Sequence, residues 1–415
     1  MADPNFDVVV FGATSFVGRI LCRYLADRFG VDGELRWAAA ARSRDRLESV
    51  RASLGDTAAG LELIVADAAD AAALITMCER ARVVVSTVGP YALYGEPLIR
   101  ACVETGTDYC DLTAEFQWMR RMITTYHSAA RESGARLVHC CGFDSIPSDL
   151  GVFFLQQRAQ ERFGKPCAHI RMRVKAMRGG FSGGTVASIT QVIEDLTDDP
   201  ELRRRLASPY CLCPQGHGFT ARQRKTRTVA YDPDFDRWTA PFLMEPINTR
   251  IVHRSNALSQ NAYGDAFRYD EAVLTGDGVK GRLMALGLAG ALAGFGIAAS
   301  FGPTRRALGN FVPAPGTGPS EQDRARGFFD LRFVGEMAAG DKIFAKVIGD
   351  MDPGYGSTAK MLGEAGACLA LDLDDSGRPG GFWTPATMFG ERLIDRLETH
   401  AGVKFELLDD AGNLR

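Results

Sequence analysis

The 415-residue chain has no strong excess of charge of either sign. It contains 48 Lys and Arg against 51 Asp and Glu, a formal net charge of −3. A near-neutral chain has no general basic field for nucleic acid, so we expect no nucleic-acid partner. Hydrophobic residues at 46% and charged residues at 24% exclude a chain that is disordered throughout. The length suggests two or three domains at about 150 residues each.

The cysteines lack the pattern of a disulfide-rich secreted protein. Ten of them are scattered along the chain, several inside apolar runs. The first twelve residues, MADPNFDVVVFG, lack the basic-then-apolar order of a signal peptide. We therefore expect a cytoplasmic protein. Cys211, Cys213 and His217 have no fourth ligand at a recognised spacing, so we expect no metal site.

Several catalytic motifs are also missing. The sequence has no Walker-type loop, no HExxH and no ordered Ser-His-Asp set, so ATPase, zinc-protease and serine-hydrolase functions lack support. Glycine, by contrast, is abundant, with 45 residues. Loops with positive φ and loops that approach a ligand closely are one cause of such an excess.

The first glycine-rich turn connects a strand to a helix. An apolar run at 7–11 predicts a buried strand, and a helical pattern begins at 19. Strand, glycine turn and helix are the context of a dinucleotide-binding fingerprint, with the pyrophosphate at the helix N-terminus. Ser15 replaces the usual middle glycine, and its hydroxyl could bind a phosphate. The predicted cofactor-binding residues of this turn are Gly12, Thr14, Ser15, Phe16, Val17 and Gly18.

The second and third predicted strands indicate which cofactor is bound. The strand at 35–41 ends at Arg42 and Ser43, where NAD-dependent enzymes usually carry an acidic residue. An arginine there can hold the 2′-phosphate of NADPH in a bidentate pair, which favours NADP(H). The alternative is that Arg42 is a solvated loop residue. Asp67, after the strand at 61–66, stands where adenine is often contacted.

Three further strands complete the series at 81–88, 106–112 and 135–141, with a helix predicted at 115–133. Together they predict a Rossmann-like, doubly wound parallel sheet over 1–150. The turn at Val88, Gly89 and Pro90 then lies under the nicotinamide. Tyr91, Tyr94 and Asp144 follow strand ends at the same edge and are the candidate catalytic proton donors. Further candidates there are Asp111, Glu115 and Ser145. For each residue, the alternative is an ordinary loop or helix-cap role.

A family resemblance rests on seven motifs: VGPY (88–91), YGEP (94–97), GTDYCDLTAE (106–115), CGFDSIPSD (141–149), GGFSGGT (179–185), GYGST (354–358) and TPA (384–386). The chain resembles the saccharopine dehydrogenase-like oxidoreductases, and most closely their mycobacterial branch of trans-acting enoyl reductases. The resemblance implies NADP(H) and a lipid or polyketide acyl substrate, free or carrier-bound. Two alternatives stay open: a saccharopine-type amino-acid dehydrogenase, and a membrane-associated scaffold that binds the cofactor without catalysis.

The remaining chain predicts an inserted α+β substrate and partner domain at 151–350, with few helical signals between 205 and 280. Residues 351–415 are expected to return to the cofactor domain through a helix at 388–399. The segment 202–231 has no acidic residue and seven basic ones, typical of a surface for an acyl carrier, a phosphopantetheine arm or anionic lipid. The alternative is a solvated face whose charges pair elsewhere.

Residues 283–301 are 19 consecutive residues without a charge, with Lys280 and Arg282 before them and Arg305 and Arg306 after them. A helix of that length spans about 28 Å, close to the thickness of bilayer hydrocarbon. Ten residues are Gly or Ala, however, and a span would divide one catalytic fold between two sides of a membrane. We expect a helix that lies peripherally on the inner face of the cell membrane, or packs against a partner subunit as in a homodimer. A buried domain helix is the alternative.

Overall fold

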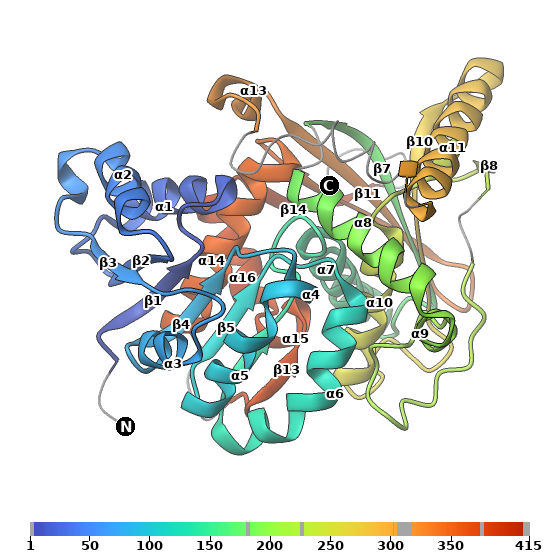
Figure 1. The fold of residues 1–415 in the computed structure, drawn as a ribbon. Helices are drawn as coiled ribbons and strands as arrows, with labels where there is room; N and C mark the ends of the chain where they lie inside the picture. Colours follow the sequence, from blue (N-terminus) through green and yellow to red (C-terminus); the bar gives the residue numbers. More distant parts are fainter. Residues whose placement is uncertain are drawn as a thin grey trace.

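The computed structural model describes residues 4–179, 183–224, 228–301, 303–304, 318–373 and 377–409. Two seven-stranded sheets, each covered by helices, make up the described chain (Figure 1). The first sheet contains the N-terminal strands and one C-terminal strand. The second sheet contains the described strands between residues 169 and 349 and the last strand of the chain. This arrangement confirms the predicted α/β fold with an added α+β part.

The first sheet is parallel and has the strand order β13-β6-β5-β4-β1-β2-β3. Its strands are β1 (Phe6–Phe11), β2 (Trp37–Ala41), β3 (Glu62–Val65), β4 (Ala81–Ser86), β5 (Asp108–Asp111), β6 (Arg136–Val138) and β13 (Gly381–Trp383). The six predicted strands are confirmed with slightly different bounds. The order reverses between β1 and β4, the point at which doubly wound sheets bind their ligands. β13 was not predicted, because three residues are too few for a pattern.

Helices cover both faces of this sheet, which explains why its strands are continuous apolar runs. One face carries α1 (Phe16–Phe29), α2 (Arg44–Leu54) and α14 (Thr358–Leu371). The other carries α3 (Ala71–Glu79), α5 (Glu96–Thr105) and α6 (Phe116–Ser133). α14 packs on β1, β4 and β5. A distant part of the sequence therefore completes the core of the N-terminal domain.

The second sheet is mixed, with the order β14-β12-β11-β7-β10-β9-β8. Only β7 and β10 pair in parallel; the other neighbours are antiparallel. Its strands are β7 (His169–Arg178), β8 (Ala230–Asp232), β9 (Arg237–Pro241), β10 (Arg268–Gly276), β11 (Phe328–Glu336), β12 (Lys342–Gly349) and β14 (Val403–Leu408). The segment 351–415 thus contributes to both sheets, with β13 in the first and β14 in the second.

Two long helices pack on the second sheet. α7 (Ile146–Phe163) contacts β11 and β12, and α10 (Glu245–Leu258) contacts β10. The expectation of few helices between 205 and 280 is wrong for α10. This helix is almost entirely buried, including its polar residues Asn248, His253 and Asn256, so it shows no amphipathic stripe in the sequence.

The predicted helix at 388–399 is also wrong as a single helix. The chain forms α15 (Pro385–Met388), α16 (Glu391–Arg396) and a π-helical turn (Leu397–Ala401). Gly390 separates α15 from α16 because its φ of 56° is incompatible with a right-handed helix. The other helices are α4 (Tyr91–Tyr94), α8 (Gly183–Asp198), α9 (Pro200–Arg205), α11 (Gly278–Ser300), α13 (Glu321–Ala325), a 3-10 turn (Asp56–Ala58) and a π-helical turn (Pro353–Ser357).

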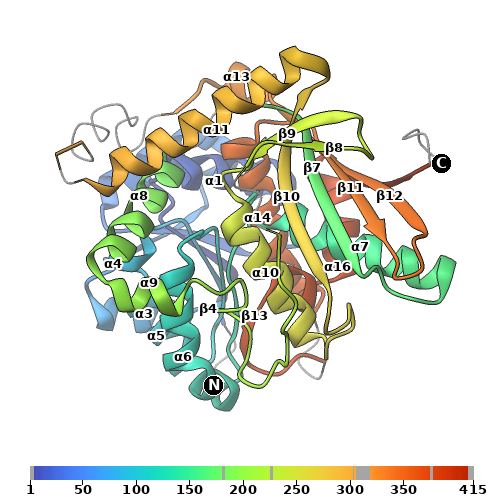
Figure 2. The same ribbon diagram turned by 90° about the vertical axis from the view of Figure 1, so that its right-hand side faces the viewer.

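The long apolar run is helical, as predicted, and forms most of α11. It runs along the outer edge of the molecule, beside β9, β10 and α8 (Figure 2). The alternative of a buried domain helix is wrong, because only Gly281, Ala285 and Ala299 are buried along its length. By length and composition α11 is the one helix of the described chain that could cross a membrane.

Candidate functional site

The glycine turn after β1 is held by close packing. Gly12 has a φ of 90°, and a Cβ there would lie 2.6 Å from Thr87 Oγ1. A Cβ on Gly18 would lie 2.1 Å from the carbonyl oxygen of Gly12. No side chain fits at either position, so α1 begins directly against the end of β1. This is the geometry that brings backbone amides close to a pyrophosphate.

Ser15 is the N-cap of α1. Its Oγ accepts a hydrogen bond from Gly18 N at 2.9 Å and lies 2.9 Å from Thr87 Oγ1. The hydroxyl therefore already stabilises the turn, whereas the sequence suggested that it could bind phosphate. The amides of Thr14, Phe16 and Val17 have no acceptor among the described residues. These three N–H groups, at the positive end of the α1 dipole, are the donors that remain for a phosphate.

Arg42 and Asp67 stand at adjacent strand ends, since Ala41 pairs with Val65. Arg42 is exposed and has no acidic partner within the described ranges. Ser43 caps α2, and Asp67 accepts a hydrogen bond from Ala69 N at 2.9 Å. An unpaired guanidinium beside the sheet edge fits the 2′-phosphate of NADP(H). Together with the glycine turn, this residue set fits a dinucleotide.

Arg42→Ala should weaken NADPH binding about 10- to 100-fold, because a charge-assisted contact to the 2′-phosphate is lost. NADH binding should change little. Titration of purified protein with each nucleotide by calorimetry measures both constants. Arg203→Ala, an exposed arginine on α9, is the matched control. An unchanged NADPH-to-NADH affinity ratio in Arg42→Ala would show that Arg42 is only a solvated residue.

The turn at Val88–Gly89–Pro90 is organised by a buried carboxylate. Glu115 accepts hydrogen bonds from Tyr91 N at 2.9 Å and Ala92 N at 2.8 Å, both in the first turn of α4. Ser188 on α8 donates a third, at 2.8 Å. Burial raises the pKa of Glu115, while these three donors favour its charged form. Glu115 therefore fixes the turn that the sequence predicts under the nicotinamide, and it is too buried to reach a substrate.

The two candidate tyrosines of α4 have opposite environments. Tyr91 is buried, its hydroxyl donates to Ser86 O at 3.0 Å, and its ring packs on Trp118. This burial argues against Tyr91 as a proton donor. Tyr94 is 48% exposed, and its hydroxyl has no hydrogen-bond partner in the described chain. Of the two, Tyr94 alone has a hydroxyl open to a bound molecule.

Asp144 lies in the loop between β6 and α7, at the same edge of the sheet. Cys141 N donates to Asp111 O at 2.6 Å, and Phe143 N donates to Thr358 Oγ1 at 3.0 Å, so the loop is fixed on both sides. The Asp144 side chain is partly exposed and has no hydrogen-bond or ion-pair partner among the described residues. Desolvation raises its pKa to about 7. An unpartnered carboxyl with such a pKa can deliver a proton at neutral pH.

Asp111 is a buried structural residue. Its carboxylate lies 2.7 Å from His139 Nδ1 and accepts hydrogen bonds from Thr113 N and Cys140 N at 3.1 Å each. These contacts connect the ends of β5 and β6. Ser145, the N-cap residue of α7, is also buried. Neither is open to a substrate.

Asp149 connects two distant motifs, CGFDSIPSD and TPA, with helix α10. Its Oδ1 accepts from Ser255 Oγ of α10 at 2.5 Å, and its Oδ2 accepts from Ala386 N of the TPA motif at 2.8 Å. Ser255 Oγ in turn lies 2.7 Å from Thr384 Oγ1. Burial raises the pKa of Asp149 to about 7. This buried contact fixes the start of α7, and with it the Asp144 loop, against the second domain.

The buried carboxyl of Glu271, near Asp144, was not identified from the sequence. Glu271 on β10 accepts from Tyr269 Oη at 2.6 Å and from Asn248 Nδ2 at 2.9 Å. Burial is the main cause that raises its pKa to about 7, and the charge of Asp144 contributes in the same direction. Glu271 lies within a strand run with no motif, so no sequence signal identified it.

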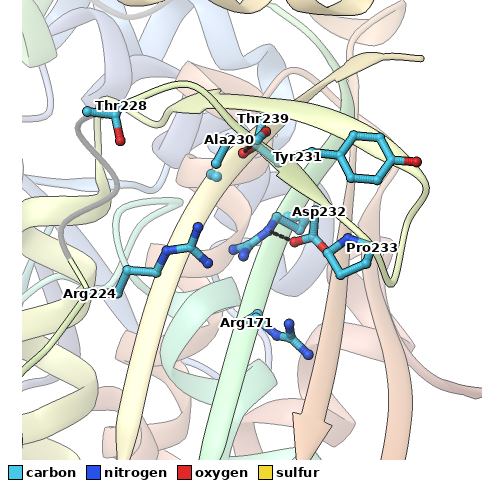
Figure 3. Close-up of a pocket in the computed structure, with 10 residues that line it drawn as sticks. Arg171, Arg224, Thr228, Ala230, Tyr231, Asp232, Pro233 and Thr239 are labelled. Carbon is cyan, nitrogen blue, oxygen red and sulfur yellow. Dashed lines mark hydrogen bonds and ion pairs between the residues drawn. The ribbon is translucent and has the colours of Figure 1, made fainter. Parts of the chain in front are cut away.

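A polar pocket lies on one face of the second sheet (Figure 3). Its charged lining residues are Arg171, Arg173, Arg224 and Asp232. Arg173 pairs with Asp232 at 2.7 Å and with Asp270 at 2.9 Å. None of the lining residues belongs to the glycine turn or to the loops after β4 and β6. The pocket is therefore separate from the candidate cofactor site.

The basic segment 202–231 is partly neutralised. Arg203, Arg204 and Arg205 are exposed on α9, but Arg204 and Arg205 both pair with Glu201. Arg222 and Arg224 are exposed as well. Lys225 and Arg227 lie outside the described residues, as does part of the second glycine-rich turn at 179–184.

Comparison with known proteins identifies the family of the chain. Residues 8–138 match the saccharopine dehydrogenase NADP-binding domain, so the chain has an NADP-binding domain and its cofactor is NADP(H). The trans-acting enoyl reductase of Mycobacterium ulcerans (strain Agy99) is 38% identical over 95% of this chain and 96% of its own. A provisionally named trans-acting enoyl reductase of Mycobacterium tuberculosis (strain H37Rv), Rv2449c, is 42% identical over 97% of both chains.

Among solved structures, saccharopine dehydrogenase (L-Glu forming) of Saccharomyces cerevisiae aligns over 97% of this chain and 99% of its own. Its TM-score is 0.55 at 12% identity, a likeness of fold alone. Both the domain match and the full-length relatives lead to one assignment. The chain belongs to the saccharopine dehydrogenase-like family of NADP-dependent oxidoreductases, in the group that contains the mycobacterial trans-acting enoyl reductases.

Proposed function

We propose that this protein is an NADPH-dependent enoyl reductase that acts in trans on an acyl chain held by a separate polyketide synthase. The observation that carries the proposal is the full-length identity of 38–42% to relatives named trans-acting enoyl reductases. The unpartnered carboxyl at Asp144, beside the predicted nicotinamide end, is consistent with it. We also propose that the protein works in the cytoplasm.

Reduction of an enoyl group adds a hydride and a proton across a carbon–carbon double bond. When bound, NADPH would supply the hydride for the β-carbon of a 2-enoyl thioester. The electron pair moves to the thioester oxygen as an enolate, and a proton then adds to the α-carbon. In this protein the glycine turn and Arg42 hold the dinucleotide, Glu115 fixes the turn after β4, and Asp144 donates the proton. Tyr94 is the second donor candidate.

The test follows NADPH consumption with two substrates side by side: a long-chain 2-enoyl thioester, presented as a coenzyme A ester and on an acyl carrier protein, and aminoadipate semialdehyde with glutamate. We expect turnover of the enoyl thioester alone, faster on the carrier. Heat-inactivated protein provides the baseline. Turnover of the amino-acid pair alone would instead establish a saccharopine-type dehydrogenase. If the protein binds NADPH but reduces neither substrate, the enoyl reductase proposal fails and a scaffold role is favoured.

A further inference from the structure

One side of α11 faces the protein, and we call it the seated face. Gly281, Ala285 and Ala299 are buried, and Leu288, Leu292 and Phe295 between them are half-buried. These residues recur every three or four positions and so lie on one face. On this side α11 contacts β9, β10 and α8. The apolar side chains of Leu288, Leu292 and Phe295 thus lie on the side of α11 that faces the protein.

The opposite side of α11 is apolar and exposed. Leu283 and Ile297 are each 62% exposed, and Leu286 and the following Phe301 are also exposed. Met284, at the border between the two sides, is exposed as well. Six of the eleven large apolar or aromatic side chains that the described chain exposes lie between 279 and 301. Soluble proteins rarely concentrate such side chains in one place without a contact that covers them.

The helix and the segment that follows it carry only basic charges. Between residues 278 and 320 the sequence has no acidic residue, whereas Lys280, Arg282, Arg305 and Arg306 are basic. Lys280 and Arg282 are exposed at the start of α11. Asp277, just before the helix, pairs with Arg237 at 3.6 Å. Basic residues next to an apolar face complement the phosphates of an anionic lipid surface.

We infer that the exposed face of α11 binds an anionic lipid bilayer, with the helix lying along the membrane surface. Leu283, Leu286 and Ile297 enter the headgroup–acyl boundary, while Lys280 and Arg282 contact lipid phosphates. The helix does not cross the bilayer, because crossing would separate its seated face from β9, β10 and α8. Figure 2 shows α11 along the outer edge of the molecule, where a flat surface can reach it.

The test measures sedimentation of the full-length protein with vesicles of phosphatidylcholine alone or mixed with phosphatidylglycerol. We expect binding to the mixed vesicles that falls as salt rises. The triple variant Leu283→Gln, Leu286→Gln, Ile297→Gln should lower the partition coefficient about 100-fold, because three apolar side chains no longer bury. The double variant Lys280→Gln, Arg282→Gln should lower it about tenfold on mixed vesicles only. Val65→Gln, an exposed apolar residue on β3, is the matched control.

Two further measurements accompany the sedimentation. Each variant is assayed for turnover of a soluble 2-enoyl thioester or, if the wild-type protein has no such activity, for NADPH binding. Turnover and NADPH binding should both stay unchanged, so a failure of this inference can be distinguished from a failure of the proposed function. Sedimentation equilibrium reports oligomeric state. If no vesicle binds the protein, or if the triple variant binds as wild type does, the inference is overturned. A dimer that the triple variant alone dissociates, without vesicle binding, would assign the face to a second copy instead.

Discussion

Gly18→Ala should abolish NADPH binding at ordinary cofactor concentrations, with the dissociation constant raised about 100-fold or more. The new Cβ would lie 2.1 Å from Gly12 O, a backbone atom that cannot move without opening the turn. The N-terminus of α1 would then shift away from the pyrophosphate, and several amide contacts would be lost together. The same overpacking should cost about 1–3 kcal/mol of unfolding free energy.

The measurement is calorimetric or fluorescence titration with NADPH, after circular dichroism has shown that the variant is folded. Gly290→Ala is the matched control, because nothing lies within 4 Å of a Cβ at that helical glycine. It should bind NADPH as wild type does. Wild-type affinity in a folded Gly18→Ala protein would contradict the assignment of the turn after β1 to the dinucleotide.

Asp144→Asn should lower kcat for the enoyl substrate by about 10²- to 10⁴-fold while NADPH affinity is unchanged, because the amide cannot deliver a proton to the α-carbon. The wild-type rate should also depend on pH. A carboxyl whose pKa is about 7 is protonated below that pH, so kcat should fall as pH rises through about 7. The variant should lose this dependence.

Steady-state kinetics over a pH series tests this prediction, and Tyr94→Phe is the companion variant. Tyr94 is the other candidate proton donor at this edge, and its side chain is exposed. A large loss of kcat in Tyr94→Phe with little change in Asp144→Asn would assign proton donation to Tyr94. A reduced kcat in Asp144→Asn with the pH dependence intact would mean that Asp144 acts only by positioning the loop.

The N-terminal domain was predictable because its signals are local. Strands buried on both faces need continuous apolar runs, and 7–11 and 35–41 show them directly. A helix that begins against a strand needs a residue without a side chain, which Gly18 supplies. Arg42 was identified because the position after the second strand has a known role in this fold. The motif resemblance extended this prediction to the full chain.

The sequence alone therefore determined the fold class, the glycine turn and the cofactor. Tertiary structure decided which candidate side chains are free of structural contacts: Tyr94 is exposed and Asp144 is half-buried without a partner among the described residues, whereas Tyr91 and Glu115 are buried and hold the turn. It also brought Glu271 toward Asp144 from more than one hundred residues away, and it left one face of α11 uncovered. Periodicity describes the neighbours of a residue along one helix or strand. Burial and long-range contacts depend on what the rest of the chain packs against that element, and no local pattern contains that information.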